Sequence, residues 1–194
     1  MPLPGFDQDS MIGRERMFRD LRSVIAKILN FVLFYFGWAI CLAGARAGRP
    51  LEGPIVVGLI SCLHLFFAAN RIGELLLLLS LGAWGCFNDS LYLNLGLIAY
   101  YPPFTFFPFL APPWVIGIWI LFATSVNYSM SWMRERWLLA ALLGACGGPF
   151  SYFTAAKVGA IRFLYPEAVL LPLLAFFWAA ILPISLWWGK RLTV

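Results

Sequence analysis

Six apolar runs, each about the length of a membrane span, make up most of this 194-residue chain. A bilayer core about 30 Å thick needs about 20 apolar residues per helix, and within it only helices or closed barrels satisfy the backbone. We therefore predict an all-α, polytopic transmembrane helical bundle of about six spans. The predicted spans cover residues 24–45, 54–69, 72–92, 113–133, 137–156 and 168–188.

The composition supports one membrane domain and no separate soluble one. Hydrophobic residues account for 62% of the chain and charged residues for 12%, whereas a soluble domain is about 45–50% apolar. The formal net charge is +5, but the charges gather near the N-terminus and between apolar runs, so we predict no nucleic-acid partner. We divide the chain into a basic amphipathic segment, residues 1–23, and a transmembrane domain, residues 24–194.

The basic residues predict the orientation of the spans, because cytoplasmic loops carry an excess of lysine and arginine. Placing both termini inside (N-in/C-in) leaves only Arg46, Arg49, Lys157 and Arg162 outside. The inner side then collects ten basic residues: Arg14, Arg16, Arg19, Arg22, Lys27, Arg71, Arg134, Arg136, Lys190 and Arg191. We expect residues 1–23 to form a basic interfacial helix or an ordinary positive anchor. A cleaved signal peptide is disfavoured by the long apolar stretch that follows.

The loop between the third and fourth predicted spans, Tyr100 to Pro112, reads YYPPFTFFPFLAP and has no charge. Aromatic residues are enriched at membrane–water interfaces. We predict that this loop lies in the outer interface as an aromatic belt, with a short re-entrant segment as the alternative.

Histidine and cysteine usage argues against metal and cofactor chemistry. The chain has one histidine, His64, whereas zinc, di-iron and bis-histidine haem sites each need more. Four cysteines lie in apolar runs and form no CxxC pair, so they are read as small core residues. We predict no metal and no cofactor.

Asp89 stands inside an apolar run and is expensive there, at about 2.5–3.5 kcal/mol on insertion scales. The 1.5 Å rise per helical residue places polar residues of the fifth span at about the same height. We predict an outer polar pocket in which Lys157 either neutralises Asp89 or extends outward. Its candidate residues are Asn88, Asp89, Ser151, Tyr152, Thr154 and Lys157. A packing kink with ordinary hydroxyl hydrogen bonds is the alternative, because Gly147-Gly148-Pro149 predicts a break in that helix.

A second set of polar residues is predicted nearer the cytoplasmic side. Thr124, Asn127, Ser131 and Arg134 recur along one face of the expected fourth helix. A short turn after the second span brings His64 near Glu74. The inner cluster comprises His64, Glu74, Asn127, Ser131 and Arg134. A seam of small polar residues between helices, with a histidine satisfied by the backbone, is the alternative.

Three strings in the chain, NDSLYLNLG, PPWVIGIWILFATSVNYSMSWM and GGPFSYFTAAKVGA, resemble a family of small six-span bacterial inner-membrane proteins of unknown function. The matching motifs are Asp89-Ser90, Asn127-Tyr128-Ser129 and Gly147-Gly148-Pro149 followed by Ser151-Tyr152. Where that family often has histidine, this chain has Tyr128. The resemblance implies a multi-pass protein of the bacterial inner membrane that accompanies lipid-modifying enzymes.

Three functions compete at this point. The first is an accessory or lipid-binding component of envelope lipid metabolism, with membrane lipids and membrane-bound lipid-modifying enzymes as partners. The second is a small intramembrane enzyme that acts on a lipid or isoprenoid headgroup, with Asp89 as acid or base. The third is a carrier for a small solute or protons. We find no internal repeat of the kind common in transporters, so a carrier would require a homodimer.

Overall fold

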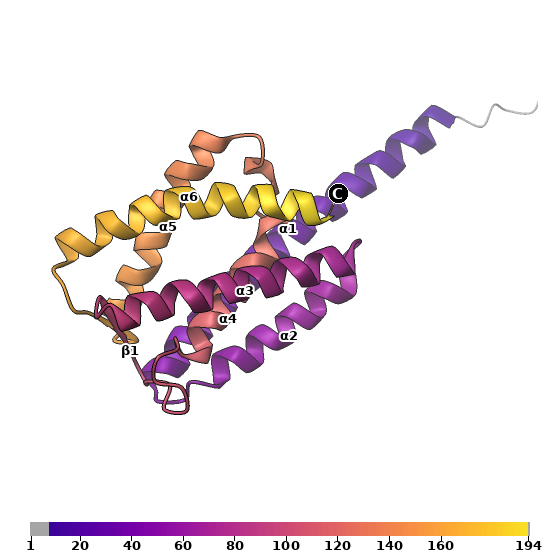
Figure 1. Cartoon of the computed structure of the whole chain (residues 1–194). Helices are drawn as coiled ribbons and strands as arrows, with labels where there is room; N and C mark the ends of the chain where they lie inside the picture. Colours follow the sequence, from indigo (N-terminus) through magenta and orange to yellow (C-terminus); the bar gives the residue numbers. More distant parts are fainter. Residues whose placement is uncertain (1–7, 194) are drawn as a thin grey trace, which may run out of the picture.

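The computed structural model describes residues 8–193, which form helices joined by loops and one short pair of strands (Figure 1). Four helices are long and apolar enough to cross a membrane: α1, α3, α5 and α6. The elements are α1 Gln8–Arg46, α2 Glu52–Phe67, α3 Arg71–Asn94, β1 Ile98–Tyr100, α4 Pro113–Val126, the 3-10 turn η1 Ser131–Met133, α5 Trp137–Lys157, β2 Ile161–Phe163 and α6 Glu167–Thr193. At 16 and 14 residues, α2 and α4 are apolar but shorter.

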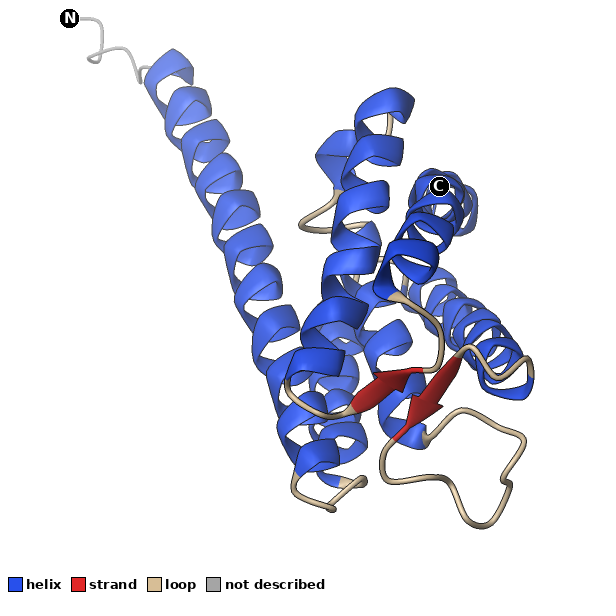
Figure 2. Cartoon of the chain, turned by 90° about the vertical axis from the view of Figure 1, so that its left-hand side faces the viewer, coloured by secondary structure: helices blue, strands red, loops and turns tan. Residues whose placement is uncertain are grey.

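The two strands tie together two loops at one end of the bundle (Figure 2). β1 follows α3 and β2 follows α5, and they pair antiparallel with Ala99 opposite Arg162. At the same end, Arg46 at the end of α1 donates to the carbonyl of Val158, 2.7 Å away. We call this end of the molecule the strand end.

The opposite end is closed by the last turns of α6. Lys190 of α6 bonds Glu135 in the loop before α5, with 2.7 Å between Nζ and Oε1. Gly73 at the start of α3 comes so close to α6 that a Cβ there would lie 2.2 Å from the carbonyl oxygen of Leu192. The start of α3, the loop before α5 and the end of α6 therefore meet away from the strand end.

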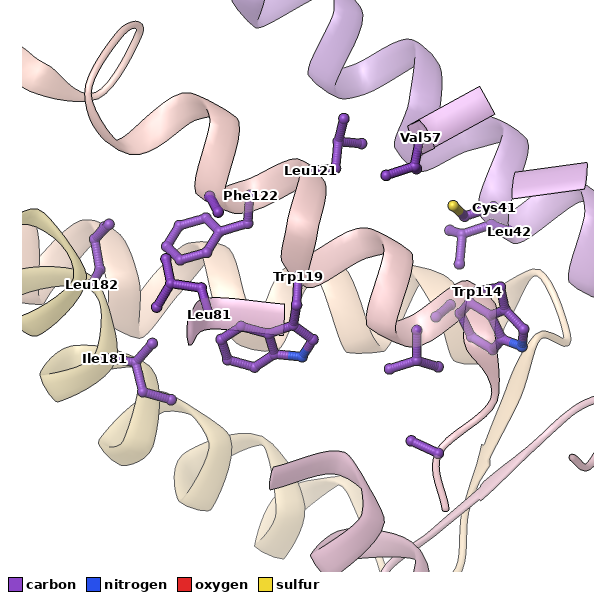
Figure 3. Packing of buried hydrophobic residues seen from close by; sticks show 14 of the residues in the cluster. Cys41, Leu42, Val57, Leu81, Trp114, Trp119, Leu121, Phe122, Ile181 and Leu182 are labelled. Atoms are coloured by element: carbon purple, nitrogen blue, oxygen red, sulfur yellow. The ribbon is translucent and has the colours of Figure 1, made fainter. Parts of the chain in front are cut away.

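α4 is the centre of the bundle, because it packs against α1, α2, α3 and α6. Its Trp114, Trp119, Leu121 and Phe122 are all buried. Figure 3 shows these side chains meeting residues of the surrounding helices. The shortest apolar helix is thus the most enclosed one.

The most extensive helix pair is α5 with α6. A Cβ added at Gly144 would lie 2.2 Å from the carbonyl oxygen of Trp178, and one at Gly148 would lie 2.0 Å from the Trp178 ring. The GxxxG spacing therefore permits close approach here. The predicted break at Gly147-Gly148-Pro149 was wrong, because α5 runs without interruption from Trp137 to Lys157.

α1 continues as one helix across the boundary predicted at residues 23–24. Its 39 residues correspond to about 58 Å at 1.5 Å per residue, far more than a bilayer core requires. Its N-terminal half stands apart from the bundle (Figure 2), and the first buried residue among those of α1 whose exposure is described is Asn30. Residues 1–7 of the predicted basic segment lie outside the described residues, and its place in the interface stays a prediction.

The prediction that the fourth span reaches residue 133 was wrong. α4 ends at Val126, and turns and η1 follow. The amides of Tyr128 and Met130 both bond the carbonyl of Ser125. These bonds span three and five residues instead of the four of an α-helix, so the chain leaves α-helical register. Thr124, Asn127, Ser131 and Arg134 therefore do not form one helical face.

The aromatic loop Tyr100–Pro112 is fastened to α3 at its base and exposed at its tip. Ser90 accepts a hydrogen bond from the amide of Ala111, at 2.8 Å, and Asn94 donates to the carbonyl of Phe109, at 2.7 Å. The Phe106 side chain is 83% exposed. An interfacial position suits this exposure, and the choice between interfacial and re-entrant stays a prediction.

Candidate functional site

Asp89 lies at the centre of the outer polar site and is fully buried, with 0% exposure. Its Oδ1 accepts hydrogen bonds from the hydroxyls of Tyr100 and Tyr152, each at 2.7 Å, and its Oδ2 accepts from the indole nitrogen of Trp119, also at 2.7 Å. Three donors suit an ionised carboxylate, which can only accept. These bonds offset part of the cost of burying the charge.

The three donors come from three separate elements. Tyr100 ends β1, and its place is fixed because the next amide, that of Tyr101, bonds the Ala160 carbonyl at 2.9 Å. Tyr152 is on α5 and Trp119 is on α4. The strand pair therefore has a direct role in the site: it brings Tyr100 over Asp89.

Gly85, one turn before Asp89 on α3, makes room for the Trp119 indole. A Cβ at Gly85 would lie 2.0 Å from the Trp119 ring, so only glycine permits this approach. The other face of Trp119 stacks on Trp178 of α6, with ring centroids 4.9 Å apart and an interplanar angle of 17°. The indole is held on both sides with its nitrogen directed at Asp89.

A cleft of about 210 Å³ opens from this site between α1 and α5. These two helices do not pack extensively against each other, and residues of α4 also line the cleft between them. The rim is apolar and exposed: Tyr35 of α1 is 49% exposed and Phe150 of α5 is 66% exposed. The polar floor consists of Asp89, Tyr100, Ser151 and Tyr152.

One hydrogen bond crosses the cleft. The indole nitrogen of Trp38 on α1 donates to the hydroxyl of Ser151 on α5, at 3.1 Å. Both residues line the cleft. The two walls are therefore joined at the polar floor and separated at the rim.

Two of the five residues predicted to surround Asp89 line the cleft with it, Ser151 and Tyr152. Asn88 is buried next to it in the chain, and its amide nitrogen has no hydrogen-bond partner among the described residues. Thr154 bonds the carbonyl of Phe150 in its own helix. Asp89 has three partners, and Thr154 is not one of them.

Lys157 does not neutralise Asp89. Its Nζ lies 3.1 Å from Oε1 of Glu167 and 4.7 Å from the centroid of the Phe153 ring. Both the lysine and the glutamate are exposed, so Lys157 extends outward, which is the alternative considered for it. The reason is geometric: Lys157 ends α5 at the strand end, beyond the level of the site.

Sequence reasoning missed Tyr100 and Trp119. Tyr100 was assigned to an interfacial belt because it begins an uncharged aromatic loop, and Trp119 lies in a wholly apolar run. A buried carboxylate requires donors, and tyrosine and tryptophan are the apolar residues that supply them. That requirement is the one signal that could have pointed to them.

The inner cluster brings four of its five predicted residues together. Glu74 is buried; its Oε2 lies 3.1 Å from Nε2 of His64, and its Oε1 accepts from the amide of Asn127 at 2.9 Å. Arg134 donates to the side-chain oxygen of Asn127. Ser131 bonds the carbonyl of Tyr128 instead. The cluster links α2, α3 and the chain after α4.

An exposed salt bridge joins Glu135 and Lys190 at the end of the molecule opposite the strand end. The pKa of Glu135 is lowered, chiefly by the hydrogen bond from Lys190 and also by that residue's positive charge. Both side chains are exposed. The pair joins the loop before α5 to the last turns of α6.

No group of three or more histidine, cysteine, aspartate or glutamate side chains in the described part of the chain could hold a metal ion. All four cysteines are free.

The sequence profile of a family described as "Protein of unknown function (DUF2878)" matches residues 27–184. The chain belongs to the DUF2878 family. The match covers the cleft, both polar sites and α2 to α5 in full, and it leaves out the start of α1 and the end of α6 of this DUF2878 protein. No curated protein matches the chain, and no solved structure does.

Proposed function

We propose that this DUF2878 protein is a lipid-binding membrane component that takes part of an amphipathic lipid into the cleft between α1 and α5. The observation that carries the proposal is the cleft itself, with exposed apolar walls and a polar floor around Asp89. A ligand that enters from the side would keep its chain against the rim and its head on the floor. Ligand pockets generally combine apolar walls with a few placed polar groups.

The proposed membrane arrangement has six crossings with both termini inside. Consecutive helices alternate between the strand end and the opposite end, as six crossings require. The four basic residues predicted to lie outside are at the strand end: Arg46, Arg49, Lys157 and Arg162. α2 and α4 are short for a 30 Å core, so we place their ends next to loops that complete the crossing.

We place the protein in the bacterial inner membrane, as an accessory component of envelope lipid metabolism that acts beside membrane-bound lipid-modifying enzymes. Three donors occupy most of the acceptor positions of Asp89, which favours a holding role over acid–base chemistry, because a reacting carboxylate must be within hydrogen-bond reach of the proton it transfers. Cross-linking of the full chain in membranes tests the partner. A monodisperse protein without a partner enzyme would count against that role.

The test of lipid binding uses Gly147, which lines the cleft and has no atom within 4 Å of an added Cβ. Gly147→Trp would fill the cleft from α5 without a clash between α5 and α6. Gly58→Trp is the matched control, because Gly58 is exposed on α2 and also has no atom within 4 Å of an added Cβ.

The full-length variants are extracted gently, and the lipids retained per protein are measured by mass spectrometry. We expect Gly147→Trp to retain at least about tenfold less of one lipid species than wild type and Gly58→Trp do. One well-placed apolar contact surface is worth about 1.4 kcal/mol or more, which corresponds to that factor. Equal retention by Gly147→Trp and Gly58→Trp, with matching melting temperatures, would refute the proposal.

A further inference from the structure

The cleft holds hydrogen-bond donors that the protein itself does not use. The indole nitrogens of Trp114 and Trp178 are buried and have no partner within the described part of the chain, and both residues line the cleft. Trp114 is only 2% exposed. An unpaired buried donor is costly, so each indole nitrogen is suited to an acceptor supplied from outside the chain.

The acceptors in the cleft are largely occupied. Asp89 already accepts three hydrogen bonds. Ser151 accepts from Trp38, and its hydroxyl hydrogen is a further donor. The donors left without a partner therefore favour a ligand head that offers acceptor oxygens.

The charge of the cleft argues against a phosphate group as the acceptor. Among the described residues that line the cleft, Asp89 is the one carboxylic acid, and none is a lysine, arginine or histidine. Lys157, the nearest cation predicted for the site, bonds Glu167 instead. A phosphate placed on this floor would face a buried carboxylate in a low-dielectric setting, where repulsion between like charges is strong.

We propose that the ligand is a neutral lipid whose head presents carbonyl oxygens to Trp114 and Trp178. This inference rests on the proposed lipid-binding function and names its ligand class. The carbonyl can belong to the ring of a prenyl quinone or to the esters of a diacylglycerol.

The experiment measures binding of three probes to the full chain in detergent micelles: decyl-ubiquinone, dioctanoylglycerol and dioctanoyl phosphatidic acid. The two glycerolipids have the same chains and ester carbonyls and differ in the phosphate. We expect at least one carbonyl probe to bind, and we expect phosphatidic acid to bind at least about tenfold more weakly than dioctanoylglycerol. The carbonyl probe that binds more tightly identifies the source of the carbonyl.

Two variants test the donors. Trp114→Phe and Trp178→Phe keep an aromatic ring and remove the N–H, and each should weaken binding of the carbonyl probe about 3- to 10-fold, the usual worth of one hydrogen bond. Trp84→Phe is the control, because Trp84 is exposed on α3 and does not line the cleft. Trp84→Phe should bind the carbonyl probe with the affinity of wild type.

The outcomes separate this inference from the function on which it rests. Equal or tighter binding of phosphatidic acid, no binding of either carbonyl probe, or unchanged affinity in both cleft variants would overturn the neutral carbonyl ligand. If Gly147→Trp still loses its retained lipid in any of these cases, lipid binding in the cleft stands. If Gly147→Trp binds the carbonyl probes as wild type does, the cleft is not the site and both proposals fail.

Discussion

The packing of α5 against α6 supports a specific prediction, because one of two adjacent glycines on α5 is crowded and the other is open. A Cβ at Gly148 would lie 2.0–2.5 Å from three ring atoms of Trp178, whereas a Cβ at Gly147 has no atom within 4 Å. Gly147→Ala and Gly148→Ala make the same chemical change one residue apart on one helix. A difference between them therefore reports packing alone.

The magnitude follows from how firmly Trp178 is held. Carbon atoms prefer separations of about 3.5–4.0 Å, so the Trp178 ring would have to move by about 1.5 Å. Its stack on Trp119, at 4.9 Å, and its edge contact with Phe122, at 5.5 Å, oppose that movement. Overpacking costs about 1–3 kcal/mol, and replacing a helical glycine by alanine gains about 0.5–1 kcal/mol. Both variants share that gain, so Gly148→Ala should be less stable than Gly147→Ala by the overpacking cost alone, about 1–3 kcal/mol.

Thermal unfolding of the purified full chain in one detergent, followed by tryptophan fluorescence, measures this difference. For a chain of this size about 1 kcal/mol corresponds to about 2–4 °C, so the two melting temperatures should differ by roughly 2–12 °C, with Gly147→Ala at or above wild type. Melting temperatures of the two variants that agree within about 1 °C would refute the close helix approach and the packing of α5 on α6 derived from it.

Three further outcomes are expected. Tyr152→Phe removes one donor from the buried carboxylate of Asp89 and should destabilise the chain by about 1.5–3 kcal/mol in denaturant unfolding; an unchanged midpoint would mean that this hydroxyl does not hold the acid. Glu74→Leu removes the hydrogen-bond partner of the His64 imidazole and of the half-buried Asn127 amide and should cost about 1–3 kcal/mol, whereas a stabilised variant would contradict a structural role for the inner cluster. Lys190→Met should raise the pKa of Glu135 toward its ordinary value, as followed by carbon-13 NMR of the carboxyl group. The salt bridge favours the folded chain above the ordinary carboxyl pKa and is lost as pH falls through the lowered pKa, so a titration unaffected by the substitution would contradict it.

The candidate site was predictable in part from the cost of its charges. Asp89 and Glu74 stand out in the sequence because a carboxylate in an apolar run must find partners, and both are buried and hydrogen-bonded in the fold. The contact of Glu74 with His64 followed from a short turn between two helices, which fixes their heights. Local geometry of this kind can be worked out along the chain.

The partners of Asp89 could not be worked out in that way. Height along the membrane normal placed Lys157 near it, but the rotation of α5 and the end of the helix direct Lys157 to Glu167. Tyr100 reaches the acid only because β1 pairs with a strand 60 residues later in the chain. Hydropathy averages over a helix and carries no information on which face meets which neighbour.

The sequence by itself determined that this chain forms apolar helices of membrane length and that a few acids within them need partners. The reason is that backbone polar groups without hydrogen bonds and charged side chains without partners both cost free energy in a bilayer. The tertiary structure decided where α4 ends, which donors surround Asp89, and that α1 stands off from α5 to leave a cleft. These features depend on long-range packing and on glycines such as Gly85, whose missing side chain matters only once Trp119 lies against it.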